Sequence, residues 1–367
     1  MPPALTRGSP PRIIRAREGE RHMLKRPLRA GDLVEVRTAS EILATLDDDG
    51  ELGALPFMPE MLPFLGRRFV VDKRAEKVCD TVAYTGSRQV KDAVMLADLR
   101  CDGAGHGGCQ AECRFFWKEA WLRPVEPGDP ERRSGADADE ALPALAGRIG
   151  ARTTRTVEDE GGPSLRYRCQ ATELPRASVR LGTFDPRPYV REFTCGNVSF
   201  GKFVKVTARA AIEEPMRKLG LVPEIPVKGP GRSPARTEQL GLEPGEWVQV
   251  KSRPEITLTL NDKGRNRGLW FDREMLPYCG GTYRVRRRIT RFIDERTAKM
   301  VELKNDCVTL EGVVCSGERS LRRWFCPRLI YPYWRDGWLR RVEAPGEARA
   351  AERAAGRAGG APGAPSR

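Results

Sequence analysis

The densest group of chemically active side chains lies in the glycine-rich sequence CDGAGHGGCQAEC. Cysteine thiolates and histidine are the ligands that zinc and iron–sulfur clusters take up in proteins. The glycines would let this loop wrap closely around an ion. We expect zinc here, with an iron–sulfur cluster as the alternative. The candidate ligands are Cys79, Cys101, His106, Cys109 and Cys113.

The chain has ten cysteines and no apolar stretch of the signal-peptide type, so we expect reduced thiols in a cytoplasmic protein. A possible second cluster consists of Cys279, Cys307, Cys315 and Cys326. One alternative is that the thiols are buried core residues, because a free cysteine packs like a small hydrophobic residue. The other alternative is an enzyme with redox or thiol chemistry, in which His106 activates a neighbouring cysteine.

Other catalytic patterns have little support in this sequence. The only histidines are His22 and His106, so a Ser-His-Asp triad is disfavoured. The sequence contains neither GxGxxG nor a P-loop motif, and we expect no nucleotide cofactor. The balance is therefore against an enzyme.

A strongly basic segment, RVRRRITRF, lies in the second half of the chain and is flanked by aromatic residues. Arginines beside aromatic rings suit phosphates and stacked bases, so this segment is a candidate anion-binding or nucleic-acid-binding face. The alternative is an ordinary arginine-rich surface. The candidate residues are Arg284, Arg286, Arg287, Arg288 and Arg291.

Residues 200–218 combine apolar side chains at roughly helical spacing with several lysines and arginines, and Pro215 is expected to kink or end that helix. A basic amphipathic helix can lie on an anionic membrane, dock in a partner's groove, or pack on its own domain. No stretch is long and apolar enough to predict a transmembrane segment.

These candidate residues are distributed over two copies of one sequence unit. The segments 31–71 and 245–285 align without a gap, with roughly seventeen of forty-one positions identical. The similarity returns where FFWKEAWLRPVE pairs with YPYWRDGWLRRVE. The net charge of +14 is uneven, because the first copy is acidic and the second is basic. This difference has three interpretations: the two copies have diverged as solvated surfaces, they face each other, or the second copy alone meets an anionic partner.

Each copy is rich in strand signals that begin with G-[DE]-x-V-x-V, while SEILATLDDDG and PEITLTLNDKG fit a short helix or a strand and turn. We predict a mainly β fold of two SH3-like small barrels with a small α+β middle module. The expected organisation is a disordered basic arm (1–30), repeat 1 (31–126), a flexible linker (127–164), a middle module (165–227), a second linker (228–244), repeat 2 (245–343) and a disordered tail (344–367).

The larger pattern resembles an uncharacterised family of bacterial proteins across most of residues 31–343. The resemblance rests on LPFMPEM, CDGAGHGGCQAEC before FFWKEAWL, and GLWFDREMLPYCG followed by CPRLIYPYWRDGWL. It implies the two-barrel layout and a bacterial cytoplasmic setting. The family has no settled activity, so the resemblance implies no catalytic role.

The function that we expect is that of a non-catalytic adaptor or accessory protein. It would hold a protein partner through its barrel surfaces, with a structural metal in repeat 1. The paired tryptophans of each repeat are expected to cap its barrel. The alternatives are a metal- or thiol-dependent redox enzyme and a nucleic-acid binder that uses repeat 2.

Overall fold

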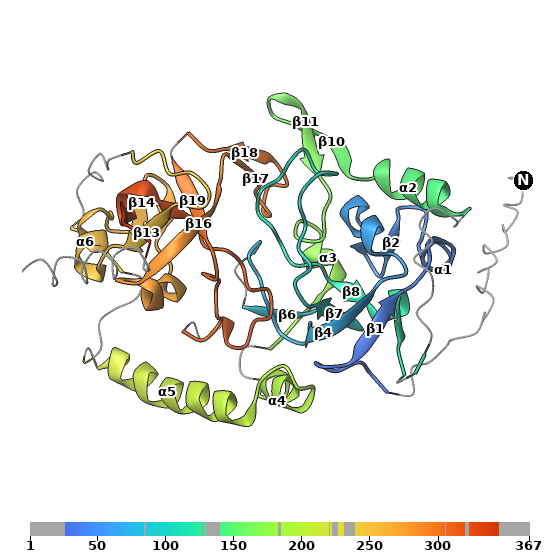
Figure 1. Cartoon of the computed structure of the whole chain (residues 1–367), viewed down its shortest axis with the longest axis horizontal. Helices are drawn as coiled ribbons and strands as arrows, with labels where there is room; N and C mark the ends of the chain where they lie inside the picture. The colour runs from blue at the N-terminus through green and yellow to red at the C-terminus, as the bar shows by residue number, and fades with distance from the viewer. Residues whose placement is uncertain are drawn as a thin grey trace, which may run out of the picture.

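The computed structural model describes residues 26–83, 86–126, 128–129, 140–182, 185–219, 221, 227–230, 239–304, 306–319 and 323–344. In these ranges the chain has a mixed fold of many small antiparallel sheets and few helices. The two repeats lie side by side, and α5 runs along the outside of the molecule (Figure 1).

Repeat 1 is built around a five-stranded antiparallel sheet with the order β8-β7-β4-β1-β9. Its elements are β1 (Leu33–Val36), α1 (Ala39–Leu43), β2 (Glu51–Leu52), β3 (Leu55–Pro56), the 3-10 helix η1 (Pro59–Phe64), β4 (Arg68–Arg74), β5 (Val78–Cys79), β6 (Ser87–Gln89), β7 (Ala93–Leu96), β8 (Trp117–Lys118), the 3-10 helix η2 (Glu119–Trp121) and β9 (Leu122–Pro124).

Repeat 2 has the equivalent sheet, with the order β20-β19-β16-β13-β21. Its elements are β13 (Trp247–Val250), α6 (Arg253–Leu258), β14 (Arg265–Asn266), β15 (Leu269–Trp270), the 3-10 helix η3 (Arg273–Tyr278), β16 (Thr282–Arg288), β17 (Arg291–Ile293), β18 (Met300–Glu302), β19 (Cys307–Leu310), β20 (Trp334–Arg335), the 3-10 helix η5 (Asp336–Trp338) and β21 (Leu339–Arg341). The register shifts at the same place in both repeats, after Val71 in β4 and after Val285 in β16.

The prediction of antiparallel strands in each repeat is confirmed, but the described residues form no closed barrel. Short two- and three-stranded sheets surround each main sheet, and several helices accompany them. The fold is therefore mixed. The antiparallel sheets agree with the prediction, whereas the mainly β character and the barrels are not confirmed.

The segment that allowed either a helix or a strand is helical in both repeats. Thr38 precedes α1 and forms a capping box with Glu41, and Ser252 and Glu255 do the same for α6. Such a pair satisfies backbone donors that the first helical turn leaves free. The helix also buries Ile42 in repeat 1 and Ile256 in repeat 2.

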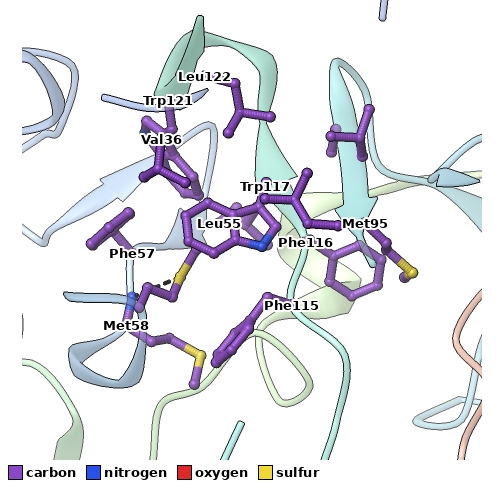
Figure 2. Close-up of a cluster of buried hydrophobic side chains, with 14 of the residues drawn as sticks. Val36, Leu55, Phe57, Met58, Met95, Phe115, Phe116, Trp117, Trp121 and Leu122 are labelled. Atoms are coloured by element: carbon purple, nitrogen blue, oxygen red, sulfur yellow. Dashed lines mark hydrogen bonds between the residues drawn. The ribbon is translucent and has the colours of Figure 1, made fainter. Parts of the chain in front are cut away.

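Two tryptophans fill the core of each repeat. Trp117 and Trp121 are fully buried in repeat 1, as Trp334 and Trp338 are in repeat 2. Figure 2 shows the repeat 1 cluster, where the ring of Phe57 meets Trp121 edge to face at a centroid distance of 5.1 Å. These side chains are central core residues, beyond the capping role that we predicted for them.

The segment between the repeats is more ordered than its composition indicates. It contains α2 (Leu142–Gly150), β10 (Thr154–Asp159), β11 (Gly162–Tyr167), α3 (Leu174–Ala177), β12 (Val179–Arg180), α4 (Arg187–Thr194) and α5 (Phe200–Lys218). The prediction of a flexible linker over 127–164 is wrong for 140–164. One reason is that α2 buries Leu145 and Ile149, one helical turn apart, in the core of repeat 1.

Two other predicted disordered or linking segments also contribute to the cores. Leu28, from the predicted N-terminal arm, is buried in repeat 1, and its carbonyl accepts a hydrogen bond from Arg74. Val227 and Leu242, at the ends of the middle module and the second linker, are buried in repeat 2. The arm before residue 26, the linker residues 231–238 and the tail after Ala344 lie outside the described residues.

Candidate functional site

Each repeat contacts the cysteine-bearing loop of the other repeat through an equivalent segment. The amide of Cys79 in repeat 1 donates to Sγ of Cys326 in repeat 2 at 3.2 Å. Conversely, the amide of Ile293, which aligns with Cys79, donates to Sγ of Cys109 at 3.4 Å. The two contacts resemble the self-complementary interface of a symmetric dimer, here formed within one chain.

The contact on the repeat 1 loop continues through Gln110. Its backbone amide donates to the carbonyl of Arg291 at 3.1 Å, and its Oε1 accepts from the amide of Thr290 at 2.7 Å. Arg291 in turn donates to the carbonyl of Gly107 at 3.1 Å. The hairpin β17–β18 of repeat 2 therefore contacts the cysteine-bearing loop of repeat 1 through several hydrogen bonds.

Glycine gives that loop its tight path. Gly103 has φ +75°, and a Cβ atom there would lie 2.0 Å from the carbonyl oxygen of Cys109. Within the loop, the carbonyl oxygen of Gly103 accepts hydrogen bonds from the amides of His106 and Gly108, both at 3.0 Å. The start and end of the loop are joined because Cys101 N donates to Cys113 O at 2.8 Å.

Four thiols line one small cavity beside this loop. Its volume is about 30 Å³, and its thiols are those of Cys101, Cys109, Cys113 and Cys169. Three of them were predicted from the sequence, but Cys169 was not. The other lining residues are Met58, His106, Ala111, Glu112, Arg114, Phe115, Phe116, Gln170, Ala171, Ile293 and Arg328.

Cys169 reaches the cavity from the segment between β11 and α3. The hydroxyl of Thr172 accepts a hydrogen bond from the Cys169 amide at 3.0 Å and fixes that turn. Burial raises the pKa of the Cys169 thiol to about 11. Burial also raises the pKa of Cys101 and of Cys113, so these thiols are neutral near pH 7 without a metal.

His106 is close to the thiols, but other groups engage its imidazole ring. Nδ1 lies 2.7 Å from Oε1 of Glu60, and Nε2 lies 2.9 Å from the carbonyl oxygen of Arg168. Burial opposes ionisation of Glu60, but the hydrogen bond and charge of His106 hold the Glu60 pKa below its ordinary value. The prediction of His106 as a metal ligand or as the base for a cysteine requires breaking one of these bonds.

Cys79 lies in a different thiol group, where it neighbours Cys326 and Cys315 of repeat 2. A hydrogen bond from Cys326 lowers the pKa of the Cys79 thiol, although burial opposes this effect and the charge of Arg328 supports it. Nη1 of Arg328 lies 3.9 Å from Sγ of Cys79. The predicted ligand set is thus divided between two places.

The predicted second cluster is also rearranged. Cys315 and Cys326 lie with Cys79, whereas Cys307 is buried in β19 and Cys279 packs against the core of repeat 2. All ten cysteines are free thiols. Among the residues that the structure describes, no group of three or more His, Cys, Asp or Glu side chains is arranged so that it could hold a metal ion.

The predicted anion-binding arginines are largely engaged within the protein. Arg286 and Arg287 pair with Glu112 of repeat 1, at 2.7 and 3.6 Å. Arg288 pairs with Asp306. The remaining pairs are those of Arg291 with Glu302 and of Arg284 with the carbonyl oxygen of Gly245. The arginines of this segment therefore form ion pairs with a carboxylate of the acidic repeat and with carboxylates of their own repeat. These pairs reduce the positive charge that is available to an external anion.

Helix α5 has one face on repeat 2 and one face in solvent. On the inner face Val206 is buried, and Phe203 stacks on Phe325 at a centroid distance of 5.6 Å. Lys202 pairs with Glu318 at 2.8 Å and adds a charged contact at the edge. The outward face is formed by the exposed residues Phe200, Val204, Ala208, Ala211, Ile212 and Met216, and Leu219, directly after the helix, is exposed as well.

No helix in the described part of the chain has the length and apolar character needed to cross a bilayer. Comparison of the chain with known proteins found no matching family model, no matching curated protein and no matching solved structure.

Proposed function

We propose that this chain is a non-catalytic adaptor or accessory protein that holds a protein partner. The observation that carries the proposal is the outward apolar face of α5. Phe200 is 65% exposed, Ile212 is 61% exposed and Leu219 is 73% exposed. A helix that is anchored on one side and apolar on the other is typical of a docking surface, because monomeric proteins rarely leave contiguous apolar patches in water.

The neighbouring helix α4 extends this surface. Its Val190 and Phe193 are exposed, and the ring of Phe193 lies 5.8 Å from that of Phe200. Lys205 is an exposed cation on α5, and the half-exposed Arg191 on α4 lies 3.8 Å from Glu76. The partner that fits this surface is an amphipathic helix with apolar anchors and acidic flanking residues.

A labelled peptide tests this assignment directly. We would use a designed amphipathic helix with leucine anchors and glutamate flanks, and compare it with the same peptide carrying lysine flanks. Fluorescence anisotropy should show that the full chain prefers the glutamate peptide. Ile212→Asp and Val204→Asp should each weaken its binding by about tenfold or more, because a charge would be buried in the contact.

Leu165→Asp is the matched control, because Leu165 is an equally apolar exposed residue on β11, away from α5. It should leave peptide binding unchanged. The proposal is overturned if neither peptide binds, or if the α5 variants bind like the wild-type chain. Binding of α5 to phosphatidylserine vesicles, or self-association that Ile212→Asp abolishes, would replace the partner helix with a membrane or a second copy.

We further propose that each repeat is an SH3-like barrel that serves as the rigid support for this surface. The strand order in each repeat supports the proposal, since a four-stranded meander is followed by a last strand that returns to pair with the first. A 3-10 helix precedes that last strand in both repeats. SH3-like folds host many binding functions, which agrees with an adaptor but does not select the partner.

The two alternative functions receive less support from the geometry. A thiol enzyme that uses His106 needs a free ring nitrogen, and both nitrogens lie within hydrogen-bond distance of Glu60 or the Arg168 carbonyl. A nucleic-acid site on repeat 2 needs free cations, whereas Arg286, Arg288 and Arg291 have carboxylate partners.

A further inference from the structure

We infer that Cys79 of repeat 1 and Cys326 of repeat 2 are an oxidation site, at which a disulfide bond forms between the two repeats. The amide nitrogen of Cys79 lies 3.2 Å from Sγ of Cys326, although the two residues are 247 positions apart in the chain. Their thiols also share a hydrogen bond. This direct contact supplies the proximity that a disulfide requires, and both residues are free thiols in this structure. The inference does not depend on the proposed partner.

One of the two equivalent contacts between the repeats contains two cysteines, and the other contains one. In the second contact, the amide of Ile293 donates to Sγ of Cys109. Ile293 aligns with Cys79, and Cys109 aligns with Cys326. An isoleucine therefore makes the same backbone contact, so packing alone does not require a cysteine at position 79. The thiol at that position adds a chemistry that isoleucine lacks.

The surroundings of Cys79 favour its thiolate, which is the reactive form of cysteine. Nη1 of Arg328 lies 3.9 Å from Sγ of Cys79, and this arginine is almost fully buried. Its guanidinium group donates to Thr81 and to Glu295, both at 2.7 Å. The hydrogen bond from Cys326 lowers the pKa of Cys79 to about 6, and the same bond together with burial raises the pKa of Cys326 well above its ordinary value. Cys79 is therefore the attacking thiolate, and Cys326 is the thiol that completes the disulfide.

Hydrogen peroxide is the oxidant that suits this site, because Cys79 is 4% exposed and Cys326 is 5% exposed, so a small molecule is needed to reach them. The Cys79 thiolate attacks one peroxide oxygen, the O–O bond breaks, and the released hydroxide takes up a proton to become water. The Cys326 sulfur then loses its proton and attacks the sulfenic acid on Cys79, whose S–O bond breaks as a second water leaves. The two thiols lose two electrons, and one peroxide becomes two water molecules.

The disulfide would restrain both the unfolded chain and the folded surface. A cross-link between residues so far apart closes a very long loop, and in the chain-entropy model longer loops restrict the unfolded chain more. In the folded protein, Phe325 beside Cys326 stacks on Phe203 of α5, so the bond would also fix the segment that supports this helix. Oxidation should therefore raise resistance to unfolding.

Peptide mapping of the full chain under non-reducing conditions tests the site. Reduced wild-type protein is treated with hydrogen peroxide, alkylated in denaturant and digested with trypsin, which places Cys79, Cys315 and Cys326 in three separate peptides. We expect a cross-linked pair of peptides that contains Cys79 and Cys326 and that dithiothreitol separates. Oxidised protein should also unfold at a higher urea concentration than reduced protein.

Cys79→Ile is the matched variant, because the second repeat forms the same backbone contact with Ile293. It should fold, lack the cross-link and show no upward shift of the urea midpoint on oxidation. Cys195→Ser is the control, since Cys195 is a half-buried thiol outside this contact, and it should retain the cross-link. The inference is overturned if Cys79 and Cys326 stay reduced in peroxide, if Cys326 pairs with Cys315 instead, or if Cys79→Ile shows the wild-type midpoint shift.

Discussion

At the scale of single residues, Glu192 in α4 is an ionisable group that the fold buries completely. Its Oε2 accepts a hydrogen bond from Asn197 at 2.7 Å, while its Oε1 has no hydrogen-bond partner in the described part of the chain. Burial raises the pKa of Glu192 to about 8, although Asn197 and the charge of Lys77 act against it. The carboxyl group is therefore mostly protonated at neutral pH.

Glu192→Gln should change how stability depends on pH. A carboxyl group whose pKa is higher in the folded state stabilises the protein fully below its unfolded pKa of about 4.5, and this contribution is lost as pH rises through about 8. The contribution of Glu192 to the stability of the wild-type protein should fall between pH 5 and 8, by at most about 1.4 kcal/mol per pH unit. Glutamine cannot ionise, so the variant should lack that slope in urea unfolding.

Glu158→Gln provides the control, because Glu158 is an exposed glutamate on β10. It should retain the wild-type slope between pH 5 and 8. An unchanged slope in Glu192→Gln would contradict the assignment of a buried, neutral carboxyl group.

Single residues also show what the sequence could indicate about the thiol site. The spacing of Cys101, Cys109 and Cys113 identified three of the four cavity thiols, because they lie in one short loop. Cys169 had no local signal, since a turn beyond hairpin β10–β11 brings it to the cavity. The contact of His106 with Glu60 could not be predicted from the sequence, because Glu60 lies in η1, far away along the chain.

At the scale of elements, α2 is the clearest case in which composition misled the prediction. Its sequence, LPALAGRIG, is rich in alanine, glycine and proline and resembles a linker. The signal that could have identified it is the spacing of Leu142, Leu145 and Ile149, which lie on one helical face. By contrast, α1 and α6 begin at local capping boxes, a signal in the sequence that favours the helix where the prediction left helix and strand open.

Two substitutions in α2 should have opposite effects on stability. Leu145 is fully buried, so Leu145→Ala should destabilise the protein by roughly 2–5 kcal/mol in urea unfolding. Gly147 is exposed in the same helix, and no atom lies within 4 Å of a Cβ built there. Gly147→Ala should therefore stabilise the protein by about 0.5–1 kcal/mol. Near-neutral results for both variants would show that α2 does not pack as described.

At the scale of the whole molecule, the repeats form one body because each supports the cysteine loop of the other. The sequence predicted the duplication and offered facing copies as one interpretation of their opposite charges. The ion pair between Glu112 and Arg286 at 2.7 Å places the acidic and basic copies in contact at this loop. The reciprocal contacts between the repeats could not be predicted from the sequence. Cys79 and Ile293 are aligned positions with different side chains, and it is their backbone amides that make the equivalent contacts.

Hydrogen–deuterium exchange on the full chain tests this interlocked arrangement most directly. Gln110 of repeat 1 accepts from the amides of Thr290 and Arg291 in repeat 2, so Gln110→Ala should accelerate exchange of those amides by roughly tenfold. Peptides of α6 in the same repeat should be unaffected. Residues 290–291 should also be unaffected in the control Gln249→Ala, because the Gln249 side chain donates to the carbonyl oxygen of Gly280 in its own repeat. Unchanged exchange at Thr290 and Arg291 in Gln110→Ala would show that the repeats do not interlock.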